Sequence, residues 1–101
     1  MVEVRLRKAA KRDLSEIGRY TIEHWSEAKA TTYLDELLDV IDQIGEHPFF
    51  GESLQDVRAG YRRRRAGHHL IFYVVTEVGT VEIARVLHER VDVQRHLEKK
   101  T

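Results

Sequence analysis

The apolar residues between Glu27 and about Glu46 recur at steps of three and four, and this spacing constrains the fold more than any other feature of the chain. It predicts one amphipathic helix on the order of 30 Å long, whose apolar face has to be covered. Ser26 can cap the start of this helix, while Gly45 and Pro48 favour its end. The apolar residues that define the spacing are Ala30, Tyr33, Leu34, Leu37, Leu38, Ile41 and Ile44.

A second helix is predicted just before this one, from about Ala9 to Trp25. Leu14, Ile17, Thr21 and Trp25 fall on one stripe of that helix. Almost no residues separate the two predicted helices, so we expect an antiparallel helical hairpin. Trp25 ends the stripe and is interpreted mainly as a core residue, with a partner contact as the alternative.

Period-two patterns at the beginning and in the second half of the chain predict strands. Val2, Val4 and Leu6 alternate with charged residues and indicate a short N-terminal strand. A loop is predicted over residues 47–60, with its aromatic residues packed onto the core. Three strands follow, joined by turns at Ala66-Gly67 and near Gly79, and we expect them at Tyr61–Arg65, His69–Thr76 and Thr80–His88.

The order of these elements predicts an α+β fold within one domain of residues 1–101. The helical hairpin packs on one face of a three-stranded antiparallel meander, and the N-terminal strand joins an edge of the sheet. The apolar run Leu70–Val75 marks the interior strand. In this strand Phe72 is expected in the core and Tyr73 on the opposite face, lining a groove. A short helix is predicted over Asp92–Leu97, followed by a frayed tail.

The net charge of zero conceals blocks of opposite sign. Residues 1–26 hold six basic and four acidic side chains, and residues 27–56 hold one basic and eight acidic. Residues 57–75 hold five basic and no acidic side chains, and residues 76–101 hold five of each. The arginine block Arg62–Arg65 therefore either faces the acidic helix inside the fold or forms a surface for an acidic partner.

Several classes of site are disfavoured by composition. The chain has no cysteine, so it has neither a disulfide framework nor a thiolate metal site. We expect no metal, because the histidines show no converging ligand set, and no cofactor, because no glycine-rich phosphate loop is present. The N-terminus does not have the pattern of a signal peptide, and no apolar run reaches the ~20 residues of a membrane span. The six histidines are His24, His47, His68, His69, His88 and His96.

Metal-independent RNA cleavage is the enzymatic alternative. It requires an acid, a base and cations around the phosphate. Arg85, His88 and Arg90 lie near the end of the third predicted strand and could supply them. Arg62 and Arg64 would share one face of a neighbouring strand. The same arginines could also pair with carboxylates or cover an exposed sheet face.

An ordered set of short motifs covers nearly the whole chain. It comprises Ala10…Asp13-Leu14…Ile17…Tyr20, Trp25…Ala30…Tyr33…Leu37, Pro48…Gly51, Arg58…Gly60-Tyr61-Arg62, Gly67-His68-His69…Phe72-Tyr73 and Ile83…Arg85-Val86-Leu87-His88…Arg90…Asp92…His96-Leu97. At these spacings the chain resembles the ParE family of bacterial toxins, within the RelE/ParE toxin superfamily. Ser26 departs from the family, which often has glycine after the tryptophan.

The resemblance implies a cytoplasmic toxin of a type II toxin–antitoxin system. It implies a non-enzymatic protein that binds and inhibits DNA gyrase and is neutralised by a ParD-type antitoxin. This antitoxin has a DNA-binding N-terminal part, so the toxin meets DNA only indirectly, and a tail that orders upon the toxin. One alternative is a plain interaction or nucleic-acid-binding module without toxicity, and the other is a RelE-type ribosome-dependent mRNA endoribonuclease. That branch uses a C-terminal catalytic tyrosine, and no tyrosine follows Tyr73 in this chain.

We expect the helical hairpin and the sheet to leave a groove that an amphipathic segment can fill. The expected antitoxin is acidic and apolar, and complements the arginines. The residues expected to contact it are Trp25, Leu37, Arg58, Tyr61, Arg62, Arg64, Tyr73 and Arg85. The residues expected to contact the target are Arg85, His88, Arg90 and His96.

Overall fold

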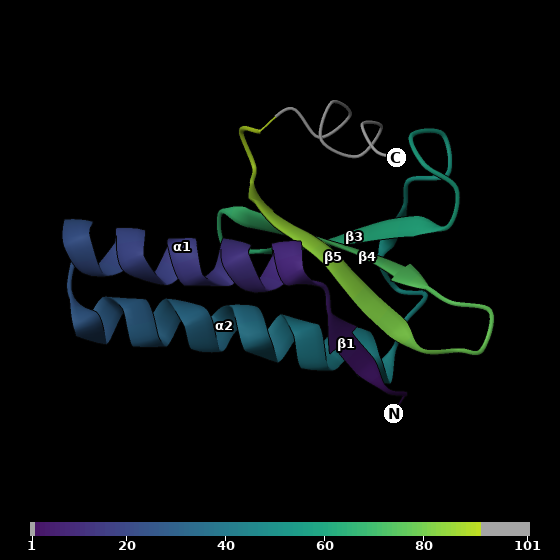
Figure 1. Cartoon of the computed structure of the whole chain (residues 1–101), viewed down its shortest axis with the longest axis horizontal. Coiled ribbons are helices and arrows are strands. Elements are labelled where there is room, and N and C mark those ends of the chain that lie inside the picture. Colours follow the sequence, from purple (N-terminus) through teal and green to yellow (C-terminus); the bar gives the residue numbers. More distant parts are fainter. Residues whose placement is uncertain (1, 92–101) are drawn as a thin grey trace.

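The computed structural model describes residues 2–91, and in these it has two helices and five strands (Figure 1). The predicted helix over 92–97 and the tail after it lie outside the described residues. In chain order the elements are β1 (Val4–Leu6), α1 (Lys8–His24), α2 (Glu27–Glu46), β2 (Glu52–Ser53), β3 (Tyr61–Ala66), β4 (His69–Val75) and β5 (Val81–His88).

The five strands form one sheet in the order β1-β5-β4-β3-β2. β3, β4 and β5 make the predicted antiparallel meander, and β1 occupies the predicted place at an edge. β1 runs parallel to β5, with Val4 opposite Val81. The two-residue β2 was not predicted: it lies inside the expected loop and pairs Glu52 with Arg63. The predicted α+β class is confirmed.

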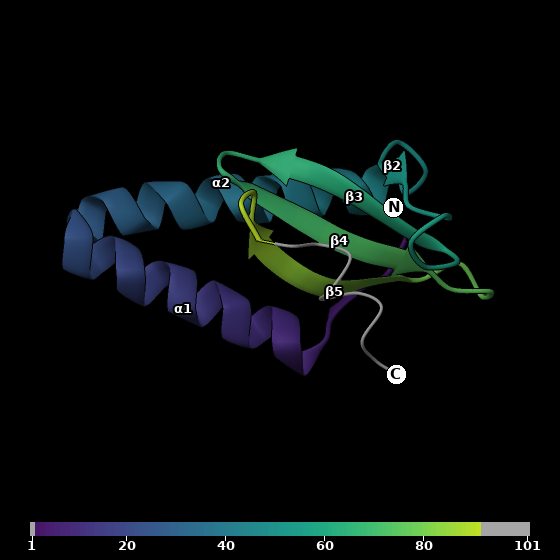
Figure 2. The same ribbon diagram turned by 90° about the horizontal axis from the view of Figure 1, so that it is seen from above.

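The two helices form the expected hairpin on one face of the sheet (Figure 2). The side chain of Ser26 accepts a hydrogen bond from the amide of Lys29 at 3.0 Å, as a helix cap does. α2 ends before Pro48, where the proline ring and the missing amide forbid another turn. Figure 2 also shows that the hairpin extends well past the β3–β4 turn, so the junction between the helices lies beyond the sheet.

The sheet is buried on both faces. A main core lies between the hairpin and the sheet and includes Leu37 and Tyr73, both fully buried. A smaller cluster covers the opposite face and includes Phe72 and Tyr61. Phe72 is a core residue, as predicted. The expectations that Tyr73 lines a groove and that Leu37 contacts a partner are wrong, because neither side chain has accessible surface.

The expectation that the aromatic residues of the loop over 47–60 pack onto the core is also wrong. Phe49 is 65% exposed and Phe50 is 75% exposed. The loop is attached to the core by its backbone instead, because the hydroxyl of Tyr73 donates to the carbonyl of Pro48 and accepts from the amide of Gly51.

Within residues 2–91, neither helix is long and apolar enough to cross a membrane.

Candidate functional site

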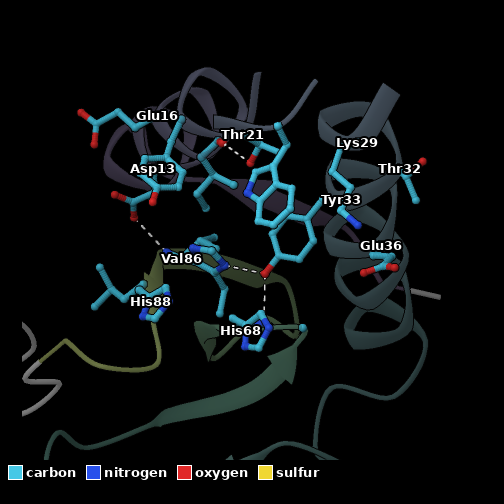
Figure 3. Close-up of a pocket in the computed structure, with 16 residues that line it drawn as sticks. Asp13, Glu16, Thr21, Lys29, Thr32, Tyr33, Glu36, His68, Val86 and His88 are labelled. Carbon is cyan, nitrogen blue, oxygen red and sulfur yellow. Dashed lines mark hydrogen bonds between the residues drawn. The ribbon is translucent and has the colours of Figure 1, made fainter. Parts of the chain in front are cut away.

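A groove of about 840 Å³ opens between the helical hairpin and one end of the sheet (Figure 3). α1 contributes Ile17 and Thr21, and α2 contributes Tyr33 from its N-terminal half. The β3–β4 turn and the end of β5 form the remaining wall. The groove exists because the helices diverge from their junction and extend past the strands (Figure 2). Its lining is mostly apolar, which suits an apolar segment of a partner better than a small charged substrate.

Asp13 of α1 closes one side of the groove by binding β5. Its carboxylate accepts hydrogen bonds from Arg85 at 2.8 and 3.0 Å and from the amide of Val86 at 2.8 Å. The register of β5 shifts here, because Phe72 pairs with Arg85 while the next residue, Tyr73, pairs with Ile83. The hydrogen bonds that Arg85 donates to Asp13 raise the pKa of Arg85 against the opposing effect of burial. Arg85 therefore holds α1 against the sheet.

The same carboxylate covers part of the open edge of β5. β1 pairs with β5 only as far as Ile83, so Val86 has no strand beside it on that side. Asp13 satisfies the amide that this leaves free. Figure 3 shows Asp13 pointing at Val86 from α1, with His88 beyond it. An extended partner segment could continue along this edge toward His88.

Tyr33 and three histidines form the opposite wall of the groove. Tyr33 Oη lies 2.6 Å from His69 Nδ1 and accepts a hydrogen bond from the amide of His68 at 3.0 Å. Gly67 makes this approach possible: its φ is +61°, and an added Cβ would lie 2.7 Å from the Tyr33 ring. The rings of His69 and His88 are 5.3 Å apart.

Burial favours the neutral form of one histidine in this cluster, His69. It lowers the pKa of His69 to about 4, and the neighbouring His88 and His68 add to that shift. Glu89 lies beside this cluster and binds His68. The hydrogen bonds that it accepts, first from Arg65 and second from His68, lower the pKa of Glu89 to about 2. Among residues 2–91 no three histidine, aspartate or glutamate side chains are placed to hold a metal ion.

The arginine block alternates between the two faces of β3. Arg62 donates to the carbonyls of Phe49 and Gly51, and Arg64 donates to Gln43 of α2. On the other face of β3, Arg63 forms an ion pair with Glu52 of β2, and Arg65 forms one with Glu89, just after β5. Arg64 thus faces the acidic helix, but no ion pair joins α2 to β3 in the part of the chain that the structure describes.

Trp25 is 70% exposed at the mouth of the groove, and its interpretation as a core residue is wrong. It lies on the apolar stripe, but it follows the last residue of α1, where the hairpin has passed the end of the sheet (Figure 2). The ammonium group of Lys29 lies over its ring, 5.6 Å from the ring centre, as in a cation–π contact. An exposed tryptophan beside an apolar groove is a typical anchor for a binding partner.

The structure separates the other predicted site residues. Arg58 stacks on the ring of Tyr61 at 5.0 Å on the sheet face opposite the groove. His88 lines the groove, and its ring accepts a hydrogen bond from the amide of Arg90 at 3.2 Å. His96 lies outside the described residues. Arg85, His88 and Arg90 do not converge, because the guanidinium of Arg85 is bound by Asp13.

Two groove residues were missed at the level of sequence. Tyr33 and His69 were assigned to the apolar stripe and to the strand, and their hydrogen bond joins elements far apart in the sequence. The sequence signal that could have indicated this contact is Tyr33 itself, because a partly buried tyrosine hydroxyl on an apolar stripe needs a hydrogen-bond partner.

Comparison with known proteins identifies relatives along almost the whole chain. The sequence matches the family model of the ParE toxin of type II toxin–antitoxin systems (parDE) over residues 4–93. Toxin ParE1 of Mycobacterium tuberculosis (strain CDC 1551 / Oshkosh) is 42% identical over 92 residues, which cover 91% of this chain and 94% of that toxin. Toxin ParE1 of Caulobacter vibrioides is 42% identical over 98 residues, which cover 96% and 99%.

Solved structures with the same fold also come from toxin–antitoxin systems. A chain of the chromosomal ParDE system from P. aeruginosa has a TM-score of 0.76 at 14% identity, covering 87% of this chain and 96% of its own. A chain of the toxin–antitoxin complex RelBE2 from Mycobacterium tuberculosis has a TM-score of 0.65 at 23% identity, covering 86% and 96%. At such identities the likeness concerns the fold.

Proposed function

The chain belongs to the ParE family of toxins of type II toxin–antitoxin systems, and we propose that it arrests growth by binding DNA gyrase until a ParD-type antitoxin neutralises it. Support comes from the family match over residues 4–93 and from two relatives named Toxin ParE1. We place the protein in the cytoplasm, where its target and its antitoxin would be found. It would need neither cofactor nor metal.

The groove carries the proposal for antitoxin binding. It offers apolar walls, the exposed ring of Trp25 and the open edge of β5 at one place. An amphipathic segment would fill the groove, and an extended segment would pair with the edge. Ordering a free tail costs several kcal/mol, so the antitoxin has to cover a large area. The chromosomal ParDE system of P. aeruginosa is a toxin–antitoxin pair with the same toxin fold.

The arginines of β3 would extend this contact along the sheet. Arg62 and Arg64 lie on the face that carries the hairpin, and neither forms an ion pair within residues 2–91. An acidic stretch of the antitoxin would neutralise them. Arg58 remains a proposed contact at the other face. Inside the groove, Glu16 and Glu36 call for a neutral or basic segment instead.

We propose that the toxin acts by binding its target and not by catalysis. The runner-up is RelE-type cleavage of mRNA on the ribosome, with Arg85, His88 and Arg90 as its residues. Arg85 donates two hydrogen bonds to Asp13, so its guanidinium is committed to the fold. Of these three residues, His88 carries an exposed imidazole and would be the one to transfer a proton. For target contacts we retain His88 and Arg90, beside the end of β5.

The proposal is tested by inducible expression with and without the neighbouring open reading frame, followed by supercoiling assays with purified gyrase. We expect growth arrest, inhibited supercoiling and rescue by the neighbouring protein. Arrested translation with intact supercoiling would contradict the gyrase target. In that case transcripts should be cut by the wild type and left intact by His88→Ala.

A further inference from the structure

Aromatic rings line the groove from both helices. α1 contributes Tyr20, which is 59% exposed, Trp25 follows the last residue of α1, and α2 contributes Tyr33. We infer that the groove binds a basic side chain of the antitoxin segment, and that Glu16 and Glu36 recognise its charge. The inference rests on the proposed function, because it names the chemistry of the segment that fills the groove.

The ring of Trp25 already holds a cation of the chain itself. The ammonium group of Lys29 lies over this ring, 5.6 Å from its centre. Such a contact is electrostatic, and the guanidinium of an arginine makes it as well. Trp25 stays 70% exposed beneath Lys29, so its ring has accessible surface left for the cation of a partner. The mouth of the groove is therefore suited to a positive charge as well as to apolar groups.

Each helix also places a carboxylate about one turn from its ring. Glu16 is four residues before Tyr20 on α1, and Glu36 is three residues after Tyr33 on α2, so each pair shares one face of its helix. The two glutamates line opposite sides of the groove (Figure 3). Neither forms an ion pair within residues 2–91. A basic side chain that enters the groove thus meets rings and unpaired carboxylates together.

The other ionisable side chains of the groove do not compensate these carboxylates. Asp13 is bound by Arg85, so this pair is neutral as a unit. Burial lowers the pKa of His69 to about 4, so its ring is uncharged near neutral pH. The Nδ1 atom of His88 accepts a hydrogen bond from a backbone amide and carries no proton, while His68 binds a carboxylate outside the groove. In the described lining, two unpaired carboxylates therefore stand against one ammonium group.

A segment that fills the groove displaces water from these carboxylates. A purely apolar segment would leave them less hydrated and without a partner, and an acidic segment would add repulsion. A lysine or arginine offsets both effects. The same antitoxin is proposed to be acidic where it meets Arg62 and Arg64, so its charge changes sign at the groove. This change of sign fixes the direction in which the segment lies and rejects antitoxins that are acidic throughout.

The test compares Glu16→Gln/Glu36→Gln, here called the groove variant, with the control Glu23→Gln/Asp39→Asn. The control removes two exposed carboxylates from the same helices outside the groove, so both variants have the same net charge. The ligand is the purified protein from the neighbouring open reading frame, and calorimetry at low ionic strength measures its affinity. An acidic ligand should bind the control equally or more tightly. It should bind the groove variant roughly tenfold or more weakly.

Stability serves as a check on both variants. All four replaced side chains are exposed, so thermal unfolding followed by circular dichroism should match the wild type. The loss of affinity in the groove variant should also become smaller as the salt concentration rises, because salt screens a contact between charges.

A second experiment locates the matching charge on the partner. Each lysine and arginine of the neighbouring protein is replaced by glutamine in turn. One replacement should weaken binding to the wild type by roughly tenfold and weaken binding to the groove variant much less, because the two changes remove the same contact. Additive losses for every replacement would overturn the inference.

Each remaining outcome has one meaning. Equal or tighter binding by the groove variant overturns the inference, and the proposed antitoxin groove is retained if Trp25→Ala still weakens binding. If neither variant binds more weakly, the antitoxin lies elsewhere and both proposals fail. Lost gyrase inhibition with retained antitoxin affinity assigns the carboxylates to the target, and a shift from dimer to monomer in the groove variant assigns them to a second copy; both overturn the inference. A neighbouring protein that does not bind the wild type contradicts both proposals.

Discussion

Asp13 connects α1 to β5 through three hydrogen bonds from only two residues, Arg85 and Val86. It is 8% exposed, so Asp13→Ala leaves a partly buried guanidinium and a backbone amide without their acceptor. We expect a loss of about 2 to 3 kcal/mol in the free energy of unfolding, measured by urea denaturation. Glu16→Ala, an exposed carboxylate on the same helix, is the control and should change little. Equal midpoints for both variants would contradict this role.

His69 makes the stability of the fold depend on pH. Its pKa falls from 6.5 to about 4 on folding, chiefly through burial. Between these values the unfolded chain binds a proton at His69 that the folded chain does not, so stability decreases as the pH drops. From about pH 7.5 to about pH 5 the wild type should lose about 1 to 2 kcal/mol more than His69→Gln.

Urea unfolding at the two pH values measures this difference. His24→Gln replaces an exposed histidine at the end of α1 and should follow the wild type. If His69→Gln shows the same dependence on pH as the wild type, His69 is not the group responsible.

At the scale of elements, the loop between α2 and β2 depends on one hydroxyl. Tyr73→Phe removes the acceptor of the Gly51 amide and the donor to the Pro48 carbonyl, while the ring stays in the core. We expect a loss of about 1 to 2 kcal/mol in the free energy of unfolding and faster hydrogen exchange at residues 49–51. Tyr20→Phe, on a 59% exposed side chain, is the control. Slow exchange in Tyr73→Phe would show that Arg62 alone holds the loop.

The elements also show what the sequence could predict. The range of α2 was predicted in full and that of α1 to within one residue at each end, because both have long stripes at helical spacing. β2 was missed because a strand of two residues is too short to show an alternation of apolar and polar side chains. The parallel direction of β1 was not predicted, since alternation fixes the face of a strand and not its direction. Trp25 was misplaced because periodicity does not show where the sheet ends. Phe49 was misplaced because a loop has no period that fixes which side chains face the core.

At the scale of the whole molecule, Trp25 links the groove to the proposed antitoxin. Its ring is 70% exposed, so Trp25→Ala should leave the free energy of unfolding nearly unchanged. The affinity for the antitoxin should fall by roughly tenfold or more, because an anchoring aromatic side chain is lost. Calorimetry with the purified antitoxin measures this, and Val78→Ala, at an 86% exposed side chain in the β4–β5 turn, serves as the control. Retained affinity in Trp25→Ala would place the antitoxin elsewhere than in the groove.

The parallel pairing of β1 with β5 joins the beginning of the chain to its last described strand. Such a contact closes a very long loop, so we expect it to form late in folding. On the ribosome, the residues of β1 are synthesised long before those of β5. A polypeptide interrupted before β5 has no neighbour for its first strand and no Arg85 to hold α1. We therefore expect the fold, and with it any surface for a target, to be complete only when translation is almost finished, so that an antitoxin made earlier could bind the toxin as it folds.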